Sequence, residues 1–136
     1  MLALMTSESH RALLEQVVHA VVGRAAQVEW VETGDGWSAH ARLQGASGRV
    51  SHVLTSPELQ EARFEEPPCS VVIVTTTDED EVLEALTKLA RAALEYSRGG
   101  GHVERRRGLV GTRPVLVLRT EEDEWRIGKR SGFIPY

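Results

Sequence analysis

The segment from Asp78 to Gly99 constrains the fold most strongly, because its pattern is that of an amphipathic helix. Asp78 and Glu81 have the spacing of a capping box at the start, and Gly99 is a residue type at which helices commonly end. The apolar positions recur at helical spacing and form one stripe: Val82, Leu83, Leu86, Leu89, Ala90, Ala93 and Leu94. This stripe has to pack against another element.

A second apolar stripe near the N-terminus predicts another helix. Ser7 or Ser9 can cap its start by accepting a hydrogen bond from a free backbone N–H group. Gly23 and the valines lower its intrinsic helix propensity, so we expect its stability to come from docking on a sheet. The stripe consists of Leu13, Leu14, Val17, Val18, Val21, Val22 and Ala25.

A three-strand meander is predicted between the helices, and its first turn is at Gly34-Asp35. A two-residue turn there joins strands at 28–32 and 37–43 and sets Trp30 opposite Ala39.

The second turn of the meander is predicted within 45–48 and leads into a strand at 49–55. Its two-residue form sets Ala41 opposite His52. Both turns then place the same side chains on one face, with Glu29 and Arg42 on the other. The predicted apolar face comprises Val28, Trp30, Trp37, Ala39, Ala41, Leu43, Val50, His52 and Leu54.

The rest of the chain is predicted to be mainly β. Ser56-Pro57-Glu58 has the signature of a helix start, so a short helix to Arg63 is expected, and Pro67-Pro68 ends it. The nearly continuous apolar run 69–77 predicts a strand covered on both faces. Further strands are predicted near 102–110, 114–120 and 124–128.

These elements predict a single α+β domain over residues 1–136 with the order αβββ(α)βαβββ. Two long helices pack on a mainly antiparallel sheet, because the strands cluster instead of alternating strictly with helices.

Composition and charge limit the setting. The N-terminal MLALM is too short for a signal peptide, no apolar run could span a bilayer, and the only cysteine is Cys69. We therefore expect a cytoplasmic protein in a reducing compartment. Residues 1–97 hold 7 basic and 15 acidic side chains (−8), whereas residues 98–136 hold 9 and 5 (+4).

The segment 98–113, RGGGHVERRRGLVGTR, concentrates the positive charge. One interpretation is a site for a small anionic ligand, with Arg105, Arg107, Arg113 and Lys129 as candidate binding residues. The alternative is a solvated loop after the helix. If the segment is extended, Arg105 and Arg107 share one face and Arg106 lies on the other. The glycines close a helix instead of opening one, which disfavours dinucleotide binding.

No pattern in the sequence predicts catalysis, a metal or a cofactor. The five histidines lack metal-ligand spacing, and Cys69 begins a buried strand with no evident base beside it. We predict no catalytic residues, no metal and no cofactor. The one enzymatic alternative uses His52, in a cleft between the meander and a helix.

The favoured hypothesis is a non-enzymatic protein-binding domain, of the general type of bacterial immunity proteins, secretion chaperones or adaptors. Acidic segments at 58–66, 78–84 and 121–124 could meet a basic partner. Homodimer formation through an edge strand is possible. Nucleic acid is disfavoured by the net charge of −4, and no membrane association is expected. The candidate interface residues are Trp37, Glu79, Glu81, Phe133 and Tyr136.

Overall fold

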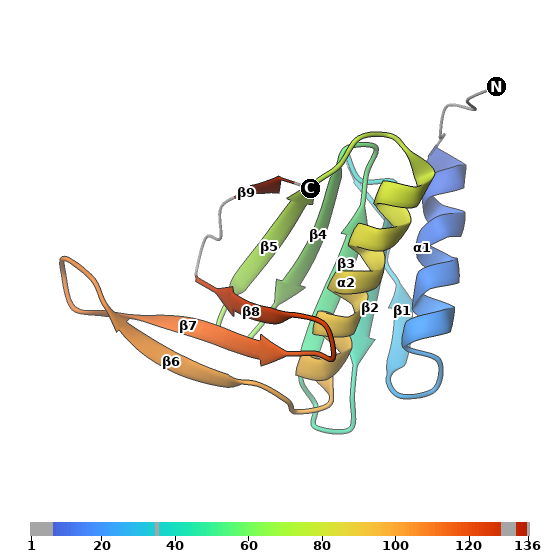
Figure 1. The fold of residues 1–136 in the computed structure, drawn as a ribbon. Coiled ribbons are helices and arrows are strands. Elements are labelled where there is room, and N and C mark those ends of the chain that lie inside the picture. Colours follow the sequence, from blue (N-terminus) through green and yellow to red (C-terminus); the bar gives the residue numbers. More distant parts are fainter. Residues whose placement is uncertain (1–6, 35, 129–132, 136) are drawn as a thin grey trace.

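In a computed structural model, which describes residues 7–34, 36–128 and 133–135, the chain forms an α+β fold of two helices and two sheets (Figure 1). The elements follow one another as α1 (Ser7–Val21), β1 (Gln27–Trp30), β2 (Ala39–Gln44), β3 (Val50–Thr55), β4 (Leu59–Phe64), β5 (Cys69–Val74), α2 (Glu79–Ser97), β6 (His102–Arg107), β7 (Thr112–Arg119), β8 (Glu124–Ile127) and β9 (Phe133–Pro135).

The larger sheet has the strand order β1-β2-β3-β4-β5-β9. Its first five strands form an antiparallel meander, and β9 pairs in parallel with β5. The smaller sheet, β6-β7-β8, is antiparallel throughout. The predicted class, two long helices on a mainly antiparallel sheet, is confirmed.

Both helices pack on one face of the larger sheet, which we call the inner face; the opposite one is the outer face (Figure 1). The small side chains Ala39, Ala41 and Ala62 are fully buried there and allow the helices to approach the sheet closely. The largest fully buried side chains of the core include Tyr96, Leu14, Leu43, Leu86 and Leu89.

The first hairpin is longer than predicted. Trp30 lies opposite Ala41 instead of Ala39, because the connection runs from residue 31 to residue 38. Since this register differs from the predicted one by an even number of residues, Val28 and Trp30 keep their predicted face.

The second hairpin overturns part of the predicted face. Ala41 lies opposite Val53, so the register differs from the predicted one by a single residue and β3 presents its other side chains to the helices. Val53 therefore faces inward. His52 lies on the outer face opposite Arg42, and Leu54 is on the outer face as well, although it is buried.

The predicted short helix after Ser56 is wrong, since residues 59–64 form strand β4. The Ser56 hydroxyl accepts a hydrogen bond from Leu59 N–H at 3.2 Å and donates one to Leu59 O at 2.8 Å, which closes the turn between β3 and β4. The following strand, β5, alternates between buried and half-buried residues, so it is not covered on both faces as predicted.

Helix α2 begins and ends as predicted. The Asp78 carboxylate accepts a hydrogen bond from Glu81 N–H at 3.3 Å. The Glu81 carboxylate does not complete a capping box with Asp78. It accepts instead from both the N–H and the hydroxyl group of Thr76. At the other end, Gly99 follows the C-cap residue Arg98. Neither helix in the described part of the chain is long and apolar enough to cross a membrane.

Candidate functional site

The β6–β7 hairpin forms an arm that projects from the body of the protein (Figure 1). Its root is held by the core: Leu116 and Leu118 of β7 and Trp125 and Ile127 of β8 belong to the same buried cluster as α2. A two-stranded ribbon is marginally stable alone, so this packing is what holds the arm in place.

Ion pairs surround the root on its polar side. Glu104 pairs with Arg126 at 2.8 Å and with His102 at 3.1 Å. The hydrogen bond from His102, and to a smaller extent the one from Arg126, lowers the pKa of the Glu104 carboxyl group. The turn after β7 is tied to α2 by the pair of Arg91 with Glu122 at 3.2 Å. Glu104 and Glu122 are therefore engaged locally.

Beyond the root, the stem of the arm is basic. Arg105 and Arg107 lie on one face of the ribbon, opposite Pro114 and Thr112. Arg106 lies on the other face, directly opposite Arg113. All four arginines are exposed, and within the described part of the chain no ion pair engages any of them.

The tip of the arm is apolar. The Gly108 N–H group donates to Gly111 O at 2.8 Å, which closes a turn with Leu109 and Val110 at its corner. The relative exposures of Leu109 and Val110 are 104% and 91%, the highest of any large apolar side chain described. Single exposed apolar residues are ordinary on protein surfaces, but here two adjacent ones make up the end of a projecting ribbon.

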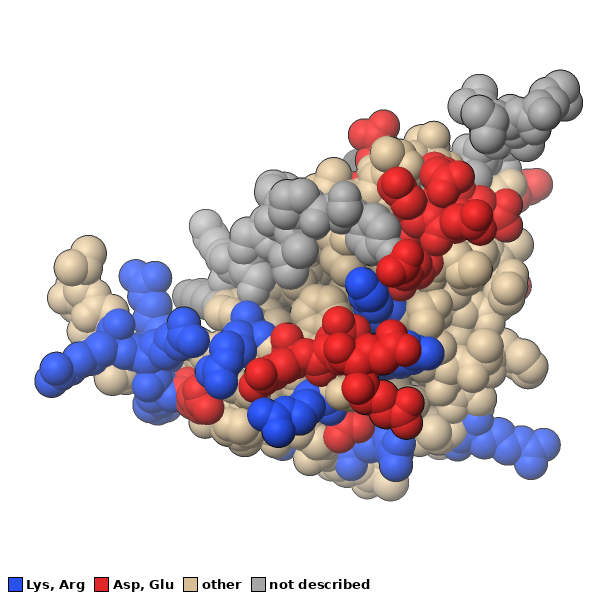
Figure 2. Space-filling model, viewed as in Figure 1, with Lys and Arg blue, Asp and Glu red and all other residues tan. Residues whose placement is uncertain are grey.

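Charge is strongly segregated between the arm and the body. Residues 103–114 hold four arginines and one glutamate, a net charge of +3. Because the whole chain has a net charge of −4, the remaining residues together carry −7. Figure 2 shows a group of basic side chains on the arm and others along the lower margin of the body, with acidic ones over the start of α2 and near the root. An anionic partner is therefore attracted to the arm and repelled by most of the body.

The predicted anion-binding set is not brought together. Arg105 and Arg107 lie on the opposite face of the ribbon from Arg113, so they cannot close around one small ligand. Lys129 lies outside the described residues. The arrangement suits an extended anionic surface that contacts both sides of the arm.

The predicted interface residues are scattered. Trp37 is half-buried, with the Arg63 guanidinium carbon 5.6 Å from its ring centre. Glu79 is exposed at the start of α2, whereas Glu81 is bound to Thr76, whose hydrogen bonds lower the pKa of the Glu81 carboxyl group. Phe133 pairs with Val72 in the sheet, and Tyr136 lies outside the described residues.

The histidine and cysteine side chains give little support for catalysis. His52 lies on the outer face, and the predicted cleft position between meander and helix is wrong because of the register of β3. Cys69 is buried, and burial raises its pKa to about 11, so the thiol stays protonated at neutral pH. No cluster of three or more potential metal ligands occurs among the residues the structure describes.

Sequence reasoning singled out the arginines of this arm but not its tip. Leu109 and Val110 lie between two glycines, and the sequence Gly-Leu-Val-Gly inside a run of arginines was the available signal of an exposed apolar turn. Comparison with known protein families, with curated proteins and with solved structures found no match to this chain.

Proposed function

We propose that this protein binds another protein, and that it does so by placing the β6–β7 arm on an acidic surface that contains an apolar recess. The observation that carries this proposal is the pair of fully exposed apolar residues, Leu109 and Val110, at the end of a stem whose four arginines form no ion pair with any described residue. Apolar anchors in a recess commonly dominate the affinity of an interface, and charged residues around them guide the approach of the partner.

The proposed binding surface is basic and meets an acidic partner, whereas the acidic segments alone suggest an acidic surface that meets a basic partner. Acidic side chains at the start of α2 take part in local structure, as the Asp78 and Glu81 hydrogen bonds illustrate. The arginines of the arm have no such role among the described residues. A protein is favoured over nucleic acid because the arm offers aliphatic side chains and no aromatic ones on which bases could stack.

The test begins with a photo-crosslinking amino acid at position 110 and, as a control, at the exposed position 84 of α2, each expressed in the native cells. We expect an adduct with a protein from position 110 and none with that protein from position 84. An adduct with nucleic acid alone contradicts the proposal.

The crosslinked protein is then purified and its affinity is measured by calorimetry. We expect Arg105→Glu and the double variant Leu109→Ser/Val110→Ser each to weaken binding at least tenfold, which corresponds to about 1.4 kcal/mol. Arg98→Glu changes an exposed arginine outside the arm by the same charge and should bind like the wild type. Arm variants that bind like the wild type would overturn the proposal.

A further inference from the structure

Strand β1 leaves one edge of the larger sheet open. It is the first strand in the sheet order and, among the residues that the structure describes, pairs only with β2. The Val31 N–H group donates to His40 O at 2.9 Å, just beyond the end of the ladder. In an antiparallel ladder, alternate residues bond to the neighbouring strand, so the N–H and C=O groups of Val28 and Trp30 point away from β2.

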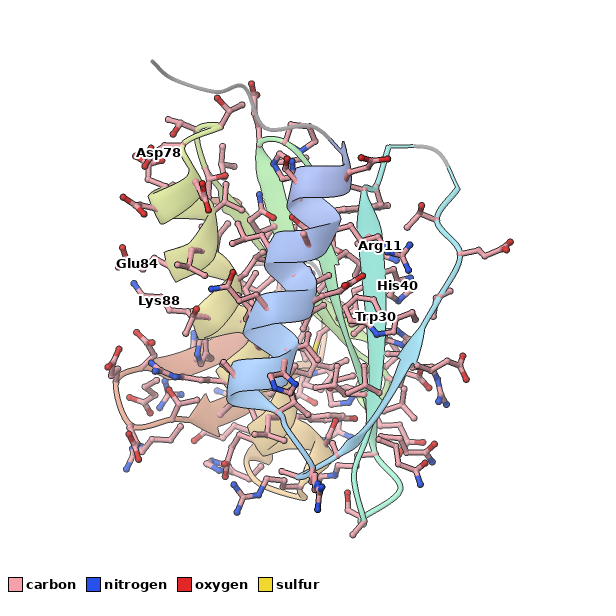
Figure 3. The ribbon with its side chains drawn as sticks, turned by 90° about the vertical axis from the view of Figure 1, so that its right-hand side faces the viewer. Arg11, Trp30, His40, Asp78, Glu84 and Lys88 are labelled. Atoms are coloured by element: carbon pink, nitrogen blue, oxygen red, sulfur yellow. The ribbon has the colours of Figure 1, made fainter. Side chains whose placement is uncertain are left out.

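This edge is short, four residues long, and is only lightly protected against strand addition. The strand contains no proline, and its one charged residue, Glu29, lies on the outer face. Strand β6, at the edge of the smaller sheet, is by contrast rich in charge. Figure 3 shows α1 in front of the sheet, with Trp30 beside Arg11 at this margin. None of the described residues bonds to the outward-pointing groups of Val28 and Trp30.

Depressions lie on both sides of the same edge, where alternate side chains of an added strand would enter. The inner one has a volume of about 510 Å³ and lies between α1 and β1, with Val18, Val28 and Trp30 as its apolar lining. The outer one, of about 520 Å³, is polar and includes Gln27 and Gln44. An alternating apolar and polar strand fits this edge, and β1 itself has that pattern.

A second copy of the chain satisfies these requirements in one register. Pairing about a two-fold axis must match inner face with inner face, so the axis passes beside a residue and not between two. The overlap of the two four-residue strands is greatest when that residue is Val28 or Glu29. An axis at Glu29 sets two carboxylates directly opposite each other, which is unfavourable. An axis at Val28 sets Glu29 opposite the neutral Gln27 and lets the two Val28 residues exchange both backbone hydrogen bonds.

Charge complementarity beyond the strand ends favours the same register. Arg24 lies in the turn between α1 and β1, outside the ladder, and with Val28 opposite Val28 it and Glu32 of the other copy lie beyond the same end of the joined strands, twice across the axis. Both side chains are exposed, and no ion pair engages either of them within the described residues. We propose that two copies join antiparallel through β1 in this register and form one continuous sheet.

The proposal is tested by light scattering coupled to gel filtration over a range of protein concentrations. We expect a mass twice that of the monomer for the wild type and a monomer for Val28→Pro. Proline is tolerated in an edge strand where its missing N–H group would point outward, so circular dichroism should report an intact fold. A wild-type chain that is monomeric at every concentration overturns the proposal. The β1 edge would then be open to a strand from another protein.

A charge-swap series tests the register without touching the backbone. We expect Glu32→Arg and Arg24→Glu each to raise the dimer dissociation constant at least tenfold, and the double variant to restore it. Glu58→Arg, an exposed charge reversal elsewhere, serves as the control and should leave the dimer unchanged. A dimer insensitive to both single changes and to Val28→Pro forms through another surface, which refutes the β1 register. These readouts are independent of the arm.

Discussion

His40 and His52 are joined by a hydrogen bond on the outer face of the sheet, with His40 Nε2 and His52 Nδ1 2.8 Å apart. The other ring nitrogen of His52, Nε2, lies 2.8 Å from a carboxylate oxygen of Glu65. A hydrogen bond donated by His52 Nε2–H to the Glu65 carboxylate leaves His52 Nδ1 as the acceptor for His40 Nε2–H. Burial, the neighbouring His52 and the Arg63 guanidinium lower the pKa of His40 to about 4.

This lowered pKa predicts that the protein loses stability as the pH falls. In the unfolded chain His40 titrates near its ordinary value of 6.5, so between pH 6.5 and about 4 the unfolded state binds more protons than the folded state. The stabilisation is complete above pH 6.5 and is lost on acidification. Because the ring is partly exposed, solvent screening reduces the effect to about 1 kcal/mol.

Urea unfolding at pH 7 and pH 4.5 measures this effect. His40→Gln keeps an amide that can donate to His52 but does not titrate, so its free energy of unfolding should fall by about 1 kcal/mol less than that of the wild type over this interval. His19→Gln, at an exposed position of α1, is the control and should behave like the wild type. Equal pH dependence in all three proteins would show that His40 does not contribute.

A second prediction concerns Gly45, where the β2–β3 turn meets the end of α2. A Cβ atom at this position would lie 1.9 Å from Ser97 O, a backbone atom that cannot move without disturbing the helix. We expect Gly45→Ala to lower the free energy of unfolding by about 2 kcal/mol. Gly34→Ala adds the same atom in open space and should change stability by less than about 0.5 kcal/mol. Chemical denaturation of both variants decides between these outcomes.

The sequence predicted the helices and the class of the fold because helical stripes, caps and turns are local signals. The register of β3 was not predictable because it depends on one backbone conformation. Gly48 has a φ of +84°, and the turn adds a residue as in a bulged hairpin, whereas the same glycine also fits a two-residue turn. The extra residue moved His52 from the inner face to the outer one.

The connection after β3 shows a second limit of local reasoning. Ser56 and Pro57 are equally suited to a helix start and to a hairpin turn. They form the turn because the residues that follow, strand β4, pair with both β3 and β5. Gln60, Ala62 and Phe64 are buried and share the inner face of β4, a period-two set that the cap signal obscured. At the candidate site, strand alternation correctly separated Arg105 and Arg107 from Arg106, but no local signal shows that a hairpin projects from the body.

Asp78 provides a third prediction, on the stability of α2. Its carboxylate accepts from Glu81 N–H at the N-terminus of the helix, so Asp78→Ala should lower the free energy of unfolding by about 1 kcal/mol. Glu84→Gln removes an exposed charge from the same helix, where the carboxylate is 3.6 Å from Lys88 Nζ, and should cost less than about 0.5 kcal/mol. Thermal denaturation compares the two. A loss in Glu84→Gln as large as in Asp78→Ala would assign the effect to charge instead of capping.

The last prediction separates the stability of the arm from its binding. Arg106 and Arg113 are directly opposite each other on one face of the ribbon, and like charges in this position repel. Arg113→Glu replaces the repulsion with an attraction, so we expect it to stabilise the ribbon by about 0.5 kcal/mol and to slow hydrogen exchange of the β6 and β7 amides. Arg113→Gln should give an intermediate rate. Because the same change lowers the arm's net charge from +3 to +1, affinity for an acidic partner should fall while the arm becomes more ordered. Faster hydrogen exchange in Arg113→Glu would mean that these arginines do not repel each other. Unchanged affinity would mean that the partner does not contact this face of the arm.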